Sequence, residues 1–460
     1  MAQVDAAVGS FAGREGVRPW VATVTRVQRP TRVRWHRLVA SLRDSYWLVP
    51  AIYVVLALAL AFGLARWDDS DPIDLGSSFS ASSASAALSA LGSGMLAFTG
   101  FVTSIVLMVI QFGTSEFSPR LLRWFRRDNT LKFALSTFIA TFLFALVATA
   151  QVGRGADAVV PTRLLVAALV LTLLSIAMFL VLIDRTANQL RVANVAQRLD
   201  IAARKVFDSV YPASATEAAA AAETARSISD RPPAQTVGND GVGAVFVTLD
   251  RPGLARIAKN HDAVIELVHA VGDHVPAGGA LARVYGDHAV PERRIRQALL
   301  LGDERTIDDD PAFAIRMIVD IAIKALSPAV NDPTTAVQCL HRIEDLLRYA
   351  ASKHLSIGVV VDDEGMTRLV YPTPTWDDLV ELALTEIRAF GAGQYQIARR
   401  LHALLDGLIA DVPERRRPAL VAQQALLEDE VTSAFPESQR AAALVPDPQG
   451  LGMPRRSTPD

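Results

Sequence analysis

The sequence has only one cysteine, Cys339, and few charged residues. A single thiol cannot form a disulfide within the chain, which excludes the disulfide-rich secreted class and fits a domain in a reducing cytosol. Charged residues make up 20% of the 460 residues and hydrophobic residues 51%, whereas soluble domains have about 25% charged residues. Because the net charge is −2, the basic excess of nucleic-acid-binding proteins is also missing, and we expect no nucleic-acid partner.

Recognisable catalytic and metal-binding motifs are missing as well. The sequence has no Walker loop, HExxH, GxSxG or dinucleotide glycine fingerprint, so no motif identifies an enzyme. Four histidines occur close together, but none has the spacing of a metal-ligand pair: His261, His269, His274 and His288. We therefore predict no catalytic residue, no metal site and no cofactor.

Four long stretches contain no charged residue: 46–65, 91–112, 133–152 and 164–183. Each is about as long as the roughly 20 apolar residues that a helix needs to cross a bilayer core. The sequence therefore predicts four transmembrane helices. A polar, Arg-rich segment precedes the first stretch, which differs from the pattern of a cleaved signal peptide, and we expect this helix to stay in the mature protein.

Basic residues are unevenly distributed around these stretches. Eight arginines precede the first, whereas the loop that follows it has four aspartates against Arg66 alone. Basic residues return in the second loop and after the fourth stretch, while the third loop has only Arg154 and Arg163. Because Lys and Arg are retained on the cytoplasmic side, we predict that both termini and all residues after 183 are cytoplasmic.

The pattern along the chain predicts an α-helical multi-pass membrane domain followed by a cytoplasmic α+β domain. The predicted parts are an Arg-rich segment (1–45), the membrane domain (46–183), a helical connector and linker (184–240), a small β-rich unit (241–290), a mostly helical domain (291–435) and a disordered tail (436–460). The segment "VGDHVPAGGAL" in the β unit resembles the hairpin of biotinyl/lipoyl-like half-barrels. No lysine stands where those carrier domains attach their cofactor, so only a half-barrel-like shape is expected.

A polar joint, "ALSPAVNDPTTAVQ", separates two helical patterns in the cytoplasmic part. Asp310 before Pro311 and Asp332 before Pro333 are helix-start signals, because aspartate accepts from first-turn N–H groups and proline there gives up no needed donor. A residue before proline is steered away from helical backbone, so the first helix should end near Ser327. The sequence thus predicts a helical hairpin over 311–326 and 333–351, with Asp332 capping its second helix.

The polar residues of the joint allow two interpretations. Asn331, Asp332, Thr334 and Thr335 form either a well-capped turn or a docking point, structural or between subunits, since one cap uses only part of these polar groups. The charge of Asp332 suits a basic partner better than an anion. The candidate basic partners are Arg305, Arg316 and Arg342.

The string "IVDIAIKALSPAVNDPTTAVQCL" at this joint closely resembles the signature of domain-of-unknown-function family 2254, a family of predicted bacterial membrane proteins. The strings "QFGTSEFSPRLLRWFRRDN" and "VGDHVPAGGAL" resemble two further segments of that family. The resemblance extends from about Tyr46 to Thr432. It implies an integral protein of the bacterial plasma membrane with a cytoplasmic C-terminal domain, and it implies no activity.

The loop after the second stretch contains four arginines, Arg120, Arg123, Arg126 and Arg127. A short helix over "SPRLLRWFRR" would place its apolar residues on one face, beside the membrane. Such a helix would bind the anionic headgroups of the lipid bilayer at about 1 kcal/mol per basic residue. The same arginines are also explained by the positive-inside rule alone, because Lys and Arg keep a loop on the cytoplasmic side.

The second and third stretches contain many small and hydroxyl residues, which favour close packing of membrane helices. No ionisable residue lies within any stretch, so a proton relay has no support. We hypothesise an oligomeric channel or transport component with a cytoplasmic regulatory domain, built from copies of this chain. The alternative is a membrane-tethered sensor or scaffold that binds a ligand or a protein partner, and a membrane enzyme has no supporting motif.

Overall fold

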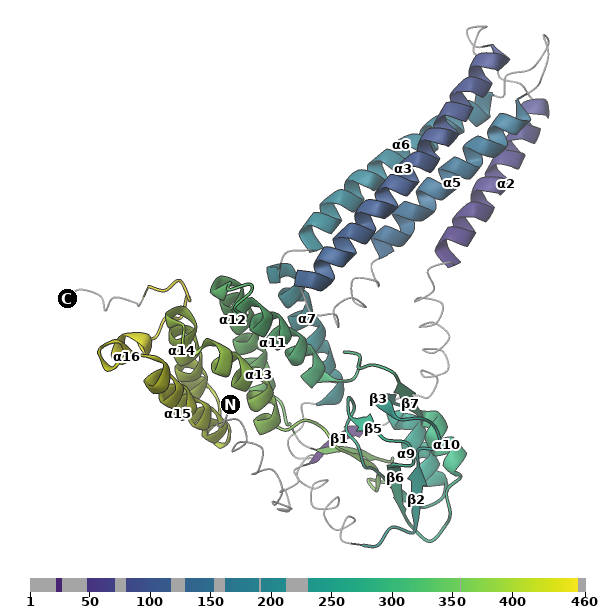
Figure 1. Cartoon of the computed structure of the whole chain (residues 1–460). Helices are drawn as coiled ribbons and strands as arrows, with labels where there is room; N and C mark the ends of the chain where they lie inside the picture. The colour runs from purple at the N-terminus through teal and green to yellow at the C-terminus, as the bar shows by residue number, and fades with distance from the viewer. Residues whose placement is uncertain are drawn as a thin grey trace. The chain divides into compact units, whose positions relative to one another are not determined.

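The computed structural model describes residues 22–26, 48–70, 80–116, 129–152, 162–189, 192–211, 231–355 and 357–453 (Figure 1). The chain divides into two compact units. The first, which we call the apolar-helix unit, contains residues 31–199 and 317–342. The second, which we call the mixed unit, contains residues 1–30, 200–316 and 343–460.

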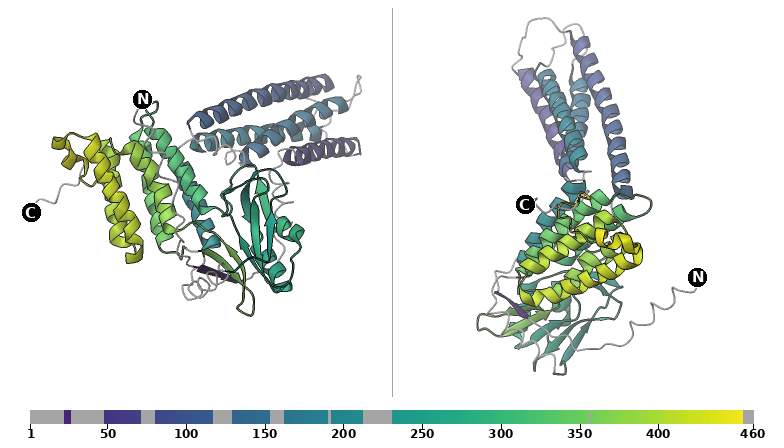
Figure 2. Two further views of the ribbon diagram at one scale, coloured as in Figure 1. Left: turned by 60° about the horizontal axis from the view of Figure 1, so that its bottom comes forward. Right: turned by 90° about the vertical axis from the view of Figure 1, so that its left-hand side faces the viewer.

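All four predicted apolar stretches are helical. The helices of the apolar-helix unit are α2 (Leu48–Ser70), α3 (Ala81–Glu116), α5 (Asn129–Gln151) and α6 (Thr162–Gln189). They run alongside one another in Figures 1 and 2. Each contains a segment long and apolar enough to cross a membrane: Leu48–Trp67, Ala81–Val109, Thr130–Gln151 and Thr162–Thr186.

Helix α5 is the central helix of this group. Half of its apolar segment is buried, compared with 11% for α2 and 17% for each of α3 and α6. Its buried face combines alanines with large aromatic rings, among them Phe138 and Phe144. The ring of Phe98 from α3 packs edge-on against Phe138 at 5.2 Å and against Phe179 of α6 at 4.9 Å. The small residues of α5 let three neighbours approach it closely.

The strands of the mixed unit form two sheets. One has six strands in the order β1-β8-β9-β4-β6-β2, and the other has three in the order β5-β3-β7. The strands are β1 (Ala22–Arg26), β2 (Gln235–Gly238), β3 (Ala244–Leu249), β4 (Val264–Leu267), β5 (His274–Val275), β6 (Ala280–Tyr285), β7 (Leu299–Gly302), β8 (Ile357–Val361) and β9 (Thr367–Tyr371).

The β-rich part is larger than the predicted unit over 241–290. The hairpin β8–β9, placed by the sequence in the mostly helical part, joins the six-stranded sheet because β9 pairs in parallel with β4, Ile265 opposite Leu369. Local patterns do not reveal such a distant pairing. Residues of "VGDHVPAGGAL" form the turn before β5, all of β5 and the first two residues of β6, and their half-barrel-like shape stays a prediction.

The helical hairpin has the predicted bounds, α11 (Pro311–Leu326) and α12 (Pro333–Ala351). The apolar residues that recur at helical spacing on these two helices are buried: Ile318, Ile321, Ala322, Ala325, Ala336, Leu340, Ile343 and Leu347. The other helices are α7 (Val192–Val210), α9 (Arg251–Asn260), α10 (Glu292–Ala298), α13 (Trp376–Gly391), α14 (Tyr395–Asp411), η2 (Glu414–Arg416), α15 (Arg417–Ala434) and α16 (Glu437–Ala443).

Residues 436–453 are ordered where the sequence predicts a disordered tail, which corrects that prediction. Helix α16 is followed by a turn around Asp447, whose carboxylate accepts from the backbone N–H groups of Gly450 at 3.0 Å and Gly452 at 2.7 Å. Arg399 of α14 donates to the carbonyl oxygens of Ala442 and Gly452. The Pro- and Gly-rich composition is typical of a tail, but these tertiary contacts order it. Residues 454–460 lie outside the described part.

Candidate functional site

The polar joint between α11 and α12 is a tight, fully bonded turn. The N–H of Asn331 donates to the carbonyl oxygen of Ser327 at 2.8 Å, and the N–H of Asp332 donates to that of Ala325 at 2.8 Å. Asn331 has a φ of +48°, in the left-handed region that asparagine tolerates better than most other residues. Asn331 thus provides the backbone reversal that ends α11 and starts α12.

Asp332 caps α12, as predicted. Its Oδ1 accepts from the backbone N–H of Thr335 at 3.1 Å, and its Oδ2 accepts from the Thr335 hydroxyl at 2.6 Å. Both carboxylate oxygens therefore bind within the first turn of the helix. Helix capping therefore explains two of the four predicted site residues, Asp332 and Thr335.

The remaining polar residues of the joint are exposed. Asn331 and Thr334 lie on the surface beside Val330, which is 43% exposed. Of the basic partners predicted for Asp332, Arg305 lies 3.5 Å from Asp310 and Arg316 pairs with Glu386, and a basic partner for Asp332 stays a prediction. The joint belongs to the same compact unit as the four apolar helices, and a docking role stays a prediction.

One face of α3 consists of small residues that no other described helix covers. Its members are all exposed and recur every three or four positions: Ser82, Ala86, Ser89, Ser93, Ala97, Gly100 and Ser104. This spacing places them along one side of a helix. We call this set the α3 small-residue face. The buried residues of α3 lie on the opposite side, among them Ala84, Leu88, Met95 and Val102.

The hydroxyl groups on this face bond within the helix. Ser93 donates to the carbonyl oxygen of Ser89 at 2.9 Å, and Ser104 donates to that of Gly100 at 3.0 Å. An added Cβ at Gly100 would meet no atom within 4 Å. The side chains of this face are therefore short, and the hydroxyl groups of Ser93 and Ser104 are bonded within the helix.

The hydroxyl residues of α5 have a different surrounding. Ser136, Thr137 and Thr141 are buried, and the Thr141 hydroxyl lies 2.9 Å from that of Ser175 in α6. Ser136 and Thr137 donate to carbonyl oxygens of α5 itself, those of Lys132 and Phe133. These hydroxyl residues of α5 are thus buried within the unit, whereas α3 presents exposed serines.

An acidic residue at the start of α11, for which the sequence predicts only a helix cap, is buried. Asp310 is 1% exposed, and its Oδ1 accepts from the backbone N–H of Phe313 at 3.0 Å. Its Oδ2 has no hydrogen-bond donor among the described residues. Burial raises the pKa of Asp310 to about 6, although the charge of Arg305 lowers it in part. The Asp-Pro pair predicts the helix start but not this burial.

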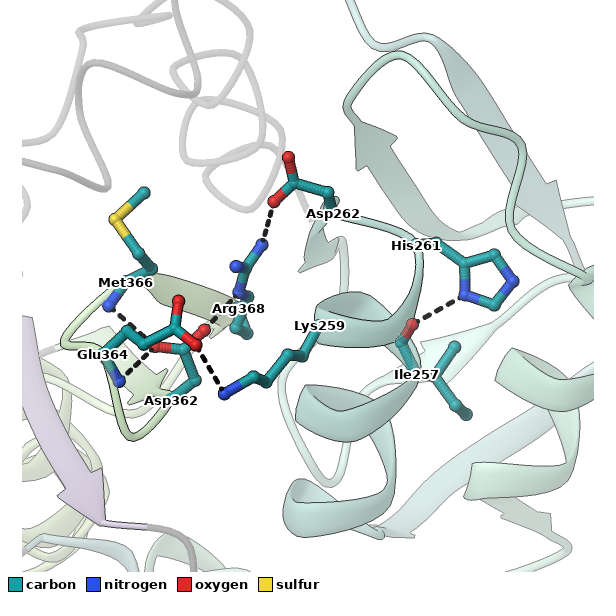
Figure 3. Close-up of polar contacts among 8 residues, drawn as sticks. All are labelled: Ile257, Lys259, His261, Asp262, Asp362, Glu364, Met366 and Arg368. Atoms are coloured by element: carbon teal, nitrogen blue, oxygen red, sulfur yellow. Dashed lines mark hydrogen bonds and ion pairs between the residues drawn. The ribbon is translucent and has the colours of Figure 1, made fainter.

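A second charged cluster holds the β8–β9 turn against α9, as Figure 3 shows. Asp362 Oδ1 accepts from the backbone N–H groups of Glu364 and Met366, both at 3.0 Å, while its Oδ2 accepts from Arg368 at 2.7 Å. Arg368 also donates to Asp262 at 2.9 Å, and Lys259 of α9 pairs with Glu364 at 3.1 Å. Each acid of this cluster has a basic or backbone partner, which indicates a structural role.

Metal-binding groups do not assemble in the described ranges, where no three or more His, Cys, Asp or Glu side chains could hold an ion. His261 instead places its Nδ1 2.9 Å from the carbonyl oxygen of Ile257 (Figure 3). Cys339 is buried, and burial raises the pKa of its thiol to about 12, so it is an unreactive core residue. The four arginines at 120, 123, 126 and 127 lie outside the described residues.

Comparisons with known proteins agree with the apolar helices. The model of the family described as "Predicted membrane protein (DUF2254)" matches residues 43–407. An uncharacterized protein of Mycobacterium bovis is 30% identical over 362 residues, which are 76% of this chain and 68% of the relative. An uncharacterized protein of Mycobacterium tuberculosis matches with the same identity and coverage. No solved structure matches the chain.

Proposed function

Because the chain belongs to domain-of-unknown-function family 2254, a family of predicted membrane proteins, we propose that α2, α3, α5 and α6 cross the bacterial plasma membrane. We propose further that several copies associate to form a channel or transport component, which the cytoplasmic domain regulates. The observation that carries this proposal is the α3 small-residue face.

The pairing of two distant strands supports an even number of crossings. Strand β1 precedes the first apolar helix, and its partner β8 follows the last one. Two strands of one sheet must lie on the same side of a membrane. Four crossings meet this condition, and the arginine-rich segments before α2 and after α6 favour the cytoplasm for that side.

The α3 small-residue face supports association of copies. Apolar side chains give membrane helices little reason to associate, because lipid tails are equally apolar; close packing of small residues provides the attraction instead. This face of α3 lies opposite the residues that contact the rest of the unit. A second copy of α3 can approach such a face closely, because the residues of the face itself are all small.

The composition of the apolar segments bears on which solutes a pore between them would conduct. Charged residues in the described segments occur only near their ends: Arg66, Lys132, Arg163, Asp184 and Arg185. A pathway between associated copies would thus have no charged side chain from the described segments away from its two ends. Such a lining suits a pore without a charged selectivity site.

Two further contacts belong to this proposal. Arg120, Arg123, Arg126 and Arg127, between α3 and α5, would contact anionic lipid headgroups on the cytoplasmic side. The exposed Asn331 and Thr334 at the joint would dock on a neighbouring subunit, since the joint belongs to the unit that contains the apolar helices.

The experiment that tests the proposal joins a size measurement with electrical recording. Purified protein should be larger than a monomer in detergent, and it should conduct in planar bilayers. A matched pair of variants sharpens the test: Gly100→Leu lies on the small-residue face and Gly94→Leu lies beside it, and neither added Cβ meets an atom within 4 Å. Only Gly100→Leu should reduce association and conduction. A monomer that never conducts would favour a membrane-tethered sensor or scaffold instead.

A further inference from the structure

The N-terminus of α11 is attached to the turn before β5 through Asp310, Arg305 and Gly272. Arg305 donates from Nε to the carbonyl oxygen of Gly272 at 2.6 Å, and the same Nε lies 3.5 Å from Asp310 Oδ2. Gly272 has a φ of +97°, and a Cβ there would stand 2.6 Å from Arg305 and closer still to Asp310 Oδ2. Glycine is therefore required at 272 for two reasons. Its φ is positive, and any side chain there would collide with Arg305 and Asp310.

The charged groups around Asp310 do not neutralise it fully. Asp273, on the same turn as Gly272, opposes its ionisation, and Arg305 with the N–H groups of Ala312 and Phe313 favours it. Tyr211 at the end of α7 is buried nearby, and the charge of Asp310 contributes to raising its pKa. Among the described residues, Arg305 is the cation that lowers the pKa of this carboxyl, and its side chain is 39% exposed while that of Asp310 is 2% exposed.

We propose that Asp310 and Arg305 form a proton-sensitive latch, which makes the attachment of α11 to the Gly272 turn depend on the surrounding pH. At neutral pH the carboxylate is ionised and held by Arg305. On mild acidification it takes up a proton and the ion pair with Arg305 is lost, while the bond from Arg305 to the Gly272 carbonyl remains. Arg305 is then left without an acidic partner at a partly exposed position.

The latch acts at a point where the two compact units are continuous. Helix α11 begins in the mixed unit and continues beyond residue 316 into the apolar-helix unit, where it ends at the joint. The latch does not rest on the proposed channel, because Gly272, Arg305 and Asp310 all lie within the mixed unit.

The expected pH dependence has an unusual sign for an aspartate. The pKa of Asp310 is raised to about 6 by burial, above about 3.9 for an unfolded aspartate, so the folded state binds the extra proton. This contribution to stability is present at acidic pH and is lost as pH rises through about 6. A neutral asparagine should not show this loss, and it remains a good helix cap.

The test is thermal unfolding of the full chain in detergent from pH 4.5 to 8, for wild type and Asp310→Asn. Relative to Asp310→Asn, the wild type should lose about 4 °C or more in Tm between the acidic and the basic end. The control is Asp308→Asn, which removes the same charge two residues away at an exposed position and should keep the wild-type profile. Arg305→Gln should move the transition to higher pH, because Arg305 lowers the pKa of Asp310.

Parallel profiles for wild type and Asp310→Asn would overturn the latch. If Asp310→Asn does not fold, the Arg305→Gln profile decides, and an unmoved transition would overturn the proposal. Neither result bears on conduction or on association through α3, so a failure of the latch and a failure of the proposed channel are distinguishable.

Discussion

Arg400 of α14, with a side chain only 2% exposed, donates from Nη2 to Oε2 of Glu344 in α12. Glu344 also accepts from Arg348 on its own helix, at 2.7 Å. Burial alone would raise the pKa of Glu344, but the hydrogen bonds from Arg348 and Arg400 outweigh it, and the net pKa lies below the usual value. This buried pair therefore joins α12 to α14 in its charged form.

Glu344→Gln should cost about 3 kcal/mol or more of unfolding free energy, because Arg400 would keep a buried charge without its partner. A matched control is Asp411→Asn, which breaks the pair of Arg348 with the 61% exposed Asp411 and should cost less than about 1 kcal/mol. Chemical denaturation of the two variants measures both losses. Equal losses would mean that the buried pair contributes no more than a surface pair.

The lowered pKa of Glu344 also predicts a pH dependence. Its folded pKa lies below its unfolded value, so its stabilising contribution is fully present above about pH 4.3 and is lost as pH falls further. Glu344→Gln should flatten this part of the acid-unfolding profile. If Glu344→Gln loses stability at acidic pH as the wild type does, Glu344 does not have a lowered pKa.

Asp332→Ala should cost about 1 kcal/mol, because both carboxylate oxygens cap α12 through Thr335. Asp332→Asn should be nearly neutral, since asparagine caps equally well. Thr334→Ala, at an exposed position, should change stability by less than about 0.5 kcal/mol. Thermal unfolding gives these values, and size-exclusion of the same variants tests docking: loss of oligomer in Thr334→Ala without loss of stability would support it.

Gly272→Ala should destabilise the protein much more than Gly278→Ala. Both glycines have positive φ, +97° and +74°, but only at Gly272 would a Cβ collide with Asp310 and Arg305. The backbone conformation alone costs about 1–2 kcal/mol in each variant, and the collision adds about 1–3 kcal/mol at 272. Unfolding by denaturant compares the two, and similar losses would show that the close approach carries no cost.

Topology reporters check the proposed crossings. Fusions after Asp69, in the last turn of α2, should report the external side, whereas fusions after Asp230 and at the C-terminus should report the cytoplasm. The prediction rests on the arginine distribution and on the pairing of β1 with β8. A cytoplasmic signal at Asp69 would overturn it.

Features set by neighbouring residues could be predicted from the sequence. The bounds of α11 and α12 follow from Asp310-Pro311, Ser327-Pro328 and Asp332-Pro333, because capping and proline restrictions act within one turn. The four apolar helices follow from composition in the same way. The positive φ of Asn331 also belongs to this local group, since asparagine is among the few residues suited to it.

Features that depend on distant residues could not be predicted. The parallel pairing of β9 with β4 joins Leu369 to Ile265, and the burial of Asp310 depends on the turn at Gly272. Likewise, the segment around Asp447 is ordered by Arg399 of α14. Helical periodicity reveals that a helix has faces, but only the packed structure shows that the hydroxyl residues of α5 face inward and those of α3 outward.

The claim that copies of the chain meet along α3 is tested most directly by cysteine cross-linking in native membranes. The background is Cys339→Ala, which removes the only native thiol. Ser93→Cys lies at the centre of the α3 small-residue face, and Ile105→Cys, at a 39% exposed position, lies about 120° around the same helix. Oxidation should give cross-linked dimers of Ser93→Cys and little product with Ile105→Cys. Equal cross-linking at both positions, or none at Ser93→Cys, would contradict association through this face.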